Sequence, residues 1–197
     1  MVLLDLAART GKPFRVFTLD TKRLPEATLG MIETVRARWG VNVEVVYPDP
    51  EEVARMVEQH GLHLFYDSPE FRQLCCDVRK VRPLQRKLRE FDAWATGMRR
   101  EQSATRAQIA KVEFVEGKVK VSPLADWTAA QVEEYTLRND LPVHPFYARG
   151  YTSIGCDPCT RPVRPGESER AGRWWWETDG KKECGIHFGP DGLRRAG

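Results

Sequence analysis

Alternating strand and helix patterns in the first quarter of the chain place the tightest limit on its fold. Residues 14–20 (FRVFTLD) and 42–48 (NVEVVYP) are short apolar, β-branched runs that follow a glycine or a proline, as buried strands do. The segment between them starts at Pro25, carries apolar residues at helical spacing and stops at Gly40. These segments predict a β-α-β unit.

The same alternation continues along the chain. Residues 50–61 resemble another helix, and residues 91–97 (FDAWATG) follow a basic helix as a third strand. Residues 112–124 contain two short alternating runs around Glu116-Gly117, which predicts a hairpin. We therefore expect an α/β fold, a largely parallel sheet flanked by helices.

Periodicity is lost in the last quarter of the chain, where Pro, Gly and Arg become frequent. We expect residues 1–145 to form an α/β domain of the nucleotide-binding type. Residues 146–197 are expected to form a cysteine-containing loop and an irregular, mobile catalytic tail. The tryptophans at 174–176 are expected to pack this tail onto the body.

Composition limits the class of protein. A chain of 197 residues that is 41% hydrophobic can bury one substantial core. It has no apolar run of the ~20 residues needed to cross a bilayer, and its start lacks the features of a signal peptide. We therefore predict a cytoplasmic protein without a membrane segment. The sequence leaves the oligomeric state open, a homo-oligomer included.

Basic residues are crowded into two stretches, 79–100 and 161–173, although the net charge is only +3. These clusters favour anionic ligands, although for Arg86, Lys87 and Arg89 we expect a solvated helix face. No recognised nucleic-acid-reading module accompanies them, so we predict no nucleic-acid partner.

Polar residues follow the first predicted strand. Asp20 and Thr21 lie where ligands bind in open α/β sheets, beyond the carboxyl ends of the strands. No glycine-rich turn precedes the helix predicted at residues 2–9, so a phosphate-binding loop is missing from the expected place. We expect this 197-residue chain, N-terminally incomplete in that respect, to bind nucleotide poorly.

Four of the five cysteines form two pairs, Cys75-Cys76 and Cys156 with Cys159. A cytoplasmic setting argues against structural disulfides, so four thiolates suggest a metal site. An adjacent pair is unusual for structural zinc and suits a larger multi-iron cluster. Spacing alone leaves zinc and a 4Fe-4S cluster both open.

The fifth cysteine, Cys184, follows Lys181 and Lys182 and precedes His187. Cationic neighbours favour the thiolate, which is the nucleophilic form. The alternative is an incidental thiol near a chain end.

Six short stretches together resemble one family, the assimilatory adenosine 5'-phosphosulfate (APS) reductases, relatives of the 3'-phosphoadenylyl sulfate (PAPS) reductases. They are TLDTKRL at 18–24, CCDVRK at 75–80, TGMRREQS at 96–103, GCDPCTR at 155–161, RWWWE at 173–177 and KKECGIH at 181–187. Lys22 departs from the family's strand-end motif, which usually has glycine there.

This resemblance implies an adenine-nucleotide α-hydrolase-like fold and a 4Fe-4S cluster held by Cys75, Cys76, Cys156 and Cys159. It also implies that APS is reduced to sulfite and AMP through an S-sulfocysteine on Cys184, with thioredoxin or a similar dithiol protein as the reductant. Paired cluster cysteines imply a preference for the substrate without a 3'-phosphate.

The substrate's anionic groups require cationic partners. By resemblance these are expected among Lys80, Arg99, Arg100, Arg170 and Arg173. His187 is expected to position the sulfate or to set the surroundings of Cys184; the alternative is a solvated histidine. Two other functions stay open: a PAPS reductase, and a zinc-stabilised nucleic-acid-binding module, which leaves Cys184 unexplained.

Overall fold

The computed structural model describes residues 1–177, 188–189 and 192–193. Its helices and strands, in chain order, are α1 (Val2–Arg9), β1 (Val16–Leu19), α2 (Glu26–Trp39), β2 (Val43–Val46), α3 (Pro50–His60), α4 (Pro69–Cys76), α5 (Arg82–Leu88), β3 (Ala93–Ala95), β4 (Val112–Val115), β5 (Lys118–Val121), α6 (Ala129–Arg138), β6 (Phe188–Gly189) and β7 (Gly192–Leu193). Within this part of the chain, no helix is both long enough and apolar enough to span a membrane.

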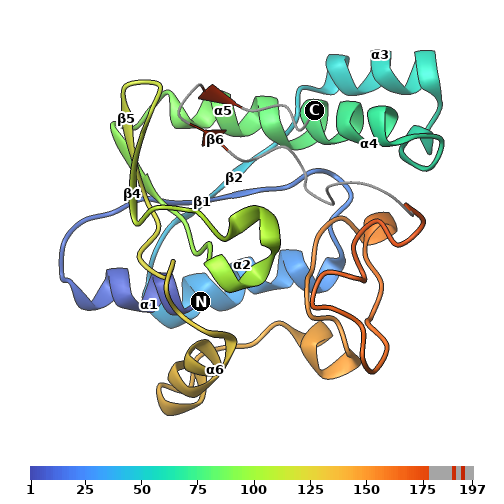
Figure 1. The fold of residues 1–197 in the computed structure, drawn as a ribbon. Coiled ribbons are helices and arrows are strands. Elements are labelled where there is room, and N and C mark those ends of the chain that lie inside the picture. The colour runs from blue at the N-terminus through green and yellow to red at the C-terminus, as the bar shows by residue number, and fades with distance from the viewer. Residues whose placement is uncertain (178–187, 190–191, 194–197) are drawn as a thin grey trace.

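The predicted β-α-β unit is confirmed. Strands β1 and β2 pair in parallel, with Val16 opposite Val43 and Leu19 opposite Val46. Helix α2 connects them and ends at Gly40, whose φ of 63° is the left-handed conformation that glycine adopts without strain. Helix α5 lies on one side of these strands and α1 and α2 on the other (Figure 1).

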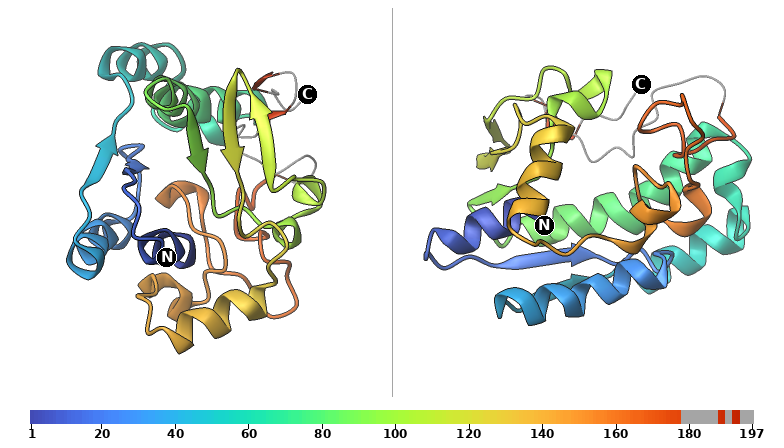
Figure 2. Two further views of the ribbon diagram at one scale, coloured as in Figure 1. Left: turned by 90° about the vertical axis from the view of Figure 1, so that its left-hand side faces the viewer. Right: turned by 90° about the horizontal axis from the view of Figure 1, so that it is seen from below.

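A second sheet has the order β3-β5-β4. Strand β3, expected within residues 91–97, pairs in parallel with β5, and β4 pairs with β5 in the predicted hairpin. The left-hand view of Figure 2 shows the three strands of this sheet side by side, next to α5. The α/β class with parallel pairing is therefore confirmed.

Helix α4 and helix α5 are joined by a π-helical turn over Asp77–Val81. Pro83 explains this widening, because it lacks the amide hydrogen that would bond to the carbonyl of Arg79 and its ring would collide with that carbonyl. At its start, α4 is capped by Ser68, whose hydroxyl accepts a hydrogen bond from the amide of Phe71 at 3.2 Å. The π turn sets where the residues after Cys76 point.

One hydrophobic cluster joins distant parts of the chain. It combines Met56 of α3, Phe65, Cys75 of α4, Cys159 and Trp174. Trp174 is 1% exposed, so the expected packing of the tryptophan segment onto the body is confirmed at this residue. The C-terminal loop is thus part of the core.

The hairpin turn offers a test of local geometry. Both of its central residues have positive φ, 51° for Glu116 and 75° for Gly117, as in a type I′ turn that favours Asn-Gly. We predict that Glu116→Asn stabilises the protein by up to about 1 kcal/mol, because asparagine tolerates this conformation better than glutamate. Urea unfolding followed by circular dichroism measures the difference. Gly117→Ala is the control and should destabilise; a Glu116→Asn protein less stable than wild type would contradict the assignment.

Candidate active site

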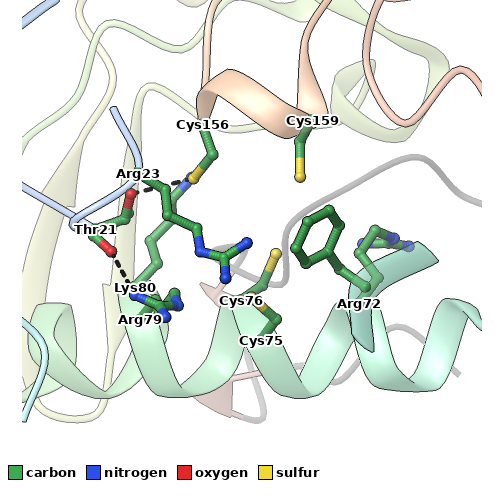
Figure 3. Close-up of a pocket in the computed structure, with 10 residues that line it drawn as sticks. Thr21, Arg23, Arg72, Cys75, Cys76, Arg79, Lys80, Cys156 and Cys159 are labelled. Carbon is green, nitrogen blue, oxygen red and sulfur yellow. Dashed lines mark hydrogen bonds between the residues drawn. The ribbon is translucent and has the colours of Figure 1, made fainter. Parts of the chain in front are cut away.

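A pocket beyond the carboxyl end of β1 collects all four paired cysteines (Figure 3). Cys75 and Cys76 come from the last turn of α4, and Cys156 and Cys159 from a loop on the opposite side that contains the short helical turn Asp157–Cys159. Thr21, two residues after β1, closes a third side, with its hydroxyl 3.2 Å from the sulfur of Cys156. The two pairs, 80 residues apart in sequence, therefore face one space.

The four cysteines are not in disulfides, and they differ in how deeply they are buried. Cys75 and Cys159 are buried, whereas Cys76 and Cys156 are half-buried. Burial raises the pKa of Cys75 and raises that of Cys159 to about 12. Without a metal these two side chains therefore stay protonated near neutral pH, and a metal must displace their protons.

Cationic side chains surround the same pocket. Arg23, Arg72, Arg79 and Lys80 line it, and the described residues that line it include no carboxylate. Arg79 is buried, and one of its terminal nitrogens donates to the backbone carbonyl of Thr21 at 3.0 Å. The Nε atom of Arg79 is buried with no hydrogen-bond partner, and burial lowers the pKa of the Arg79 guanidinium. The pocket is therefore suited to an anion.

The donor set and the charge fit a thiolate-ligated iron–sulfur cluster. Such a cluster takes one cysteine thiolate for each of four irons, which spreads its ligands around a larger centre than a single ion. Among the described residues, no group of three or more His, Cys, Asp or Glu side chains could hold a metal ion as arranged. The cavity is only about 20 Å³, so an occupant requires the pocket to open.

Arg23 is the side chain best placed to make that room. Its guanidinium extends between the two cysteine pairs, over the ring of Phe65 at 4.8 Å (Figure 3). It donates to the carbonyl of Leu62 at 2.5 Å. Because Arg23 is half-buried and long, its head can turn outward without unfolding the site.

The strand-end residues Asp20 and Thr21 are buried beside this pocket, as their position in sequence suggests. Asp20 accepts a hydrogen bond from the backbone amide of Lys22 at 2.8 Å, and the Lys22 ammonium lies 3.3 Å from its other oxygen. Lys22 has a φ of 59°, a conformation that glycine adopts more easily. The departure from glycine is thus accommodated by contacts with Asp20.

The predicted cationic ligands differ in their distance from the pocket. Lys80 lines the pocket, and Arg173 is buried next to it, with Nε 3.4 Å from the carbonyl oxygen of Cys159. Arg170 lies nearby, 5.9 Å from the ring centroid of Trp174 and within 3.5 Å of the Ser153 hydroxyl.

Arg99 and Arg100 point to different partners. Arg99 is buried and pairs with Glu101 at 3.2 Å and with Glu169 at 3.8 Å, which connects it to the loop that carries Arg170. Arg100 pairs with Asp126 and donates to the carbonyl of Ile109, away from the pocket. Arg99 is therefore the better placed of the two.

Cys184 and His187 lie outside the described residues, and their roles stay predictions. The division of the chain at residue 145 also stays a prediction.

Sequence reasoning overlooked Arg23, Arg72 and Arg79 as pocket residues. Arg79 follows Cys75 by four residues and Arg72 precedes it by three, spacings that place side chains on one helical face. That spacing could have identified Arg72 and Arg79, whereas it gives no signal for Arg23.

Comparison with known protein families and structures defines the class. The model of the phosphoadenosine phosphosulfate reductase domain matches residues 1–162. The solved PAPS reductase of Candida auris, in a phosphate complex, superposes with a TM-score of 0.66 at 28% identity, over 80% of this chain and 75% of that one. The chain belongs to the APS/PAPS reductase family.

Particular relatives are closer in sequence. The adenosine 5'-phosphosulfate reductase of Burkholderia cepacia is 52% identical over 95% of this chain and 76% of its own length. That of Allochromatium vinosum is 47% identical over 95% of this chain and 74% of its own. The adenine-nucleotide α-hydrolase-like fold expected from the resemblance is confirmed by the PAPS reductase neighbour.

Two glycines of the cysteine loop allow a matched test of its packing. A side chain on Gly172 would overlap the backbone oxygen of Arg161, whereas one on Gly155 would overlap only the guanidinium of Arg173. We predict that Gly172→Ala destabilises the protein by about 1–3 kcal/mol, as overpacking does, and that Gly155→Ala costs less because a side chain can shift. Urea unfolding gives both values, and tryptophan emission should change in Gly155→Ala as Arg173 moves from Trp174. Equal stabilities of Gly172→Ala and wild type would show that this packing is wrong.

Proposed function

We propose that this protein reduces adenosine 5'-phosphosulfate to sulfite and AMP in sulfate assimilation. The observation that carries the proposal is the 52% identity, over 95% of the chain, to a relative named for that activity. The pocket supports it independently, because paired cysteines and several cationic side chains meet at the strand ends where α/β folds bind ligands.

The cofactor in this proposal is one 4Fe-4S cluster held by Cys75, Cys76, Cys156 and Cys159. When bound, the cluster supplies a compact centre of charge beside the substrate site. Arg79 supports this assignment, since an anionic cluster would give its buried Nε the hydrogen-bond acceptor that it lacks in the described structure. Zinc on the same thiolates is the alternative.

The substrate's phosphate and sulfate groups are bound by basic side chains near the pocket. Arginine forks suit such oxyanions, and Arg173 and Lys80 are the best-placed cations, with Arg170 and Arg99 on the adjoining loop. Asp20 and Thr21 shape the strand end that faces the nucleotide. His187 orients the sulfate or stabilises the Cys184 thiolate.

Cys184 is the nucleophile in this scheme. Its thiolate attacks the sulfur atom of the substrate, a bond forms between the two sulfurs, and the sulfur–oxygen bond to AMP breaks. AMP leaves with that electron pair. The enzyme then carries an S-sulfocysteine, and Lys181 and Lys182 favour the thiolate needed for the attack.

A dithiol protein such as thioredoxin completes the reaction. One of its thiolates attacks the sulfur of Cys184 and expels sulfite, which gives a mixed disulfide. Its second thiol then forms the internal disulfide and returns Cys184 to the thiol. The dithiol is thereby oxidised as the sulfo group is reduced to sulfite. A cytoplasmic location suits this reductant.

The cofactor assignment predicts the metal content of the protein. Anaerobically purified protein should contain four irons and four sulfides per chain, because four cysteines face one pocket. Iron and sulfide analysis with visible absorbance measures this. Cys76→Ser and Cys156→Ser should lower iron content, whereas Cys184→Ser should leave it unchanged. Stoichiometric zinc without iron would contradict the assignment.

The nucleophile assignment predicts a covalent adduct. Because this chain is expected to bind nucleotide poorly, the holoenzyme is incubated with a large excess of APS and no reductant. This should add about one SO3 unit to Cys184, as a nucleophilic mechanism requires, and thioredoxin should remove it. Intact-mass and peptide mass spectrometry locate the adduct, after nucleotide binding has been measured separately. Cys184→Ser should bind nucleotide yet form no adduct and release no sulfite. Preferential reaction with PAPS would reassign the substrate, and an adduct at another residue would reassign the nucleophile.

A further inference from the structure

A buried ion pair joins helix α4 to the end of the C-terminal loop. Nε of Arg72 donates to a carboxylate oxygen of Glu177 at 2.5 Å, and the two side chains are only 2% and 5% exposed. The partners are 105 residues apart in sequence. Arg72 stands one helical turn before Cys75, so the pair connects the cysteine-bearing helix to the RWWWE segment.

The surroundings of the pair are strongly cationic. The Arg72 guanidinium lies 4.6 Å from the ring centroid of Trp174, and the Arg173 guanidinium lies 4.5 Å from the same ring. Trp174 is itself buried, and its backbone oxygen accepts a hydrogen bond from the amide of Glu177 at 3.0 Å. Glu177 is therefore held in a tight turn and brings a negative charge to a place crowded with guanidinium groups.

A buried carboxylate is costly unless a cation and further donors satisfy it, and the same holds for a buried guanidinium. Each partner here makes the burial of the other tolerable. The pair therefore fixes how residues 172–177 lie against α4, because shifting the segment would leave both charges buried without a partner. Hydrophobic packing of Trp176 against Tyr66, at 4.5 Å between ring centroids, supports the same placement.

We propose that the Arg72–Glu177 pair positions the chain for the reaction, by holding residues 172–177 on α4 and so fixing the point from which the chain runs to Cys184. The inference rests on the proposed function in its second half, the role of Cys184. Six residues lie between Glu177 and Cys184, so the two Cα atoms are seven steps apart, a span of at most about 25 Å. Fixing one end of so short a span limits where the thiolate can go, and such orientation is a large part of catalytic rate. Arg72 and Glu177 are positioning residues, since they act through this segment.

The holding role is tested with trypsin on the full chain. Arg173 is only 6% exposed, so we expect it to be protected from cleavage while the segment stays on α4. Glu177→Gln keeps the shape and removes the charge, so cleavage after Arg173 should be at least tenfold faster than in wild type. Arg72→Lys keeps a cation without the guanidinium geometry and should give a smaller increase. Unchanged cleavage after Arg173 in both variants would overturn the proposal.

Glu167→Gln is the matched control. Glu167 pairs with Arg161 in the same loop at 2.7 Å, with both side chains 26% exposed, and makes no contact with Glu177 among its hydrogen bonds. Its loss should leave cleavage after Arg173 unchanged. Equal acceleration in Glu167→Gln and Glu177→Gln would mean general loosening of the loop and would overturn a specific role for the pair.

The positioning role is tested by the reaction of the holoenzyme with APS. Glu177→Gln should lower kcat at least tenfold with KM and iron content unchanged, and Arg72→Lys should recover part of the loss. Faster cleavage with unchanged kcat would overturn the positioning role. If wild-type protein forms no adduct on Cys184, the proposed function fails, and the tryptic result alone then decides whether the pair holds the segment.

Discussion

Positive charge buried around the four paired cysteines is the constraint on which the rest of the structure depends. Arg72, Arg79 and Arg173 are each less than 10% exposed, and Lys80 joins two of them in lining the pocket. Buried cations are unfavourable unless anions or hydrogen-bond acceptors satisfy them. Glu177 serves Arg72, and backbone carbonyls serve Arg79 and Arg173, yet the Nε of Arg79 has no partner. In the proposed holoenzyme, metal-bound thiolates of the same pocket would supply the missing negative charge, and the cysteines and the arginines would then stabilise each other's burial.

A π-helical turn between α4 and α5 brings two of these cations to the pocket. Because Pro83 cannot continue the hydrogen-bond ladder of α4, the chain widens into the π turn over Asp77–Val81 before α5 begins. Arg79 and Lys80 lie within this turn and line the pocket beside Cys75 and Cys76. π turns inside helices are frequent at functional sites, and here the turn places two cations directly after the two cysteines that end α4.

The sequence was a good guide to local structure and to the cysteines, and a poor guide to buried charge. Strand and hairpin patterns are local, so β1, β2 and the β4–β5 turn could be predicted. The two cysteine pairs carry their chemistry in their residue type. Arg72 and Glu177 could not be paired in advance, because a lone arginine or glutamate is usually solvated and their meeting depends on tertiary packing. Neighbouring Arg99 and Arg100 were equivalent in sequence, yet the extended backbone of Arg99 separates them, one toward Glu169 and the other toward Asp126.

Hydrogen bonds join the cysteine loop (residues 155–172) to the RWWWE segment (residues 173–177), so the two form one structural unit. The carbonyl of Cys159 accepts hydrogen bonds from the amide of Trp174 at 3.3 Å and from the Arg173 side chain at 3.4 Å. The amide of Arg161 donates to the carbonyl of Gly172 at 2.9 Å, and residues 160 and 173 form a β-bridge. In the proposed function, a metal bound by Cys159 would act on the backbone that holds Arg173, and the Arg72–Glu177 pair holds the far end of the same segment. The proposed cofactor site, the proposed anion site and the segment that leads to Cys184 therefore share one set of contacts, so we expect a change in one of these contacts to affect all three.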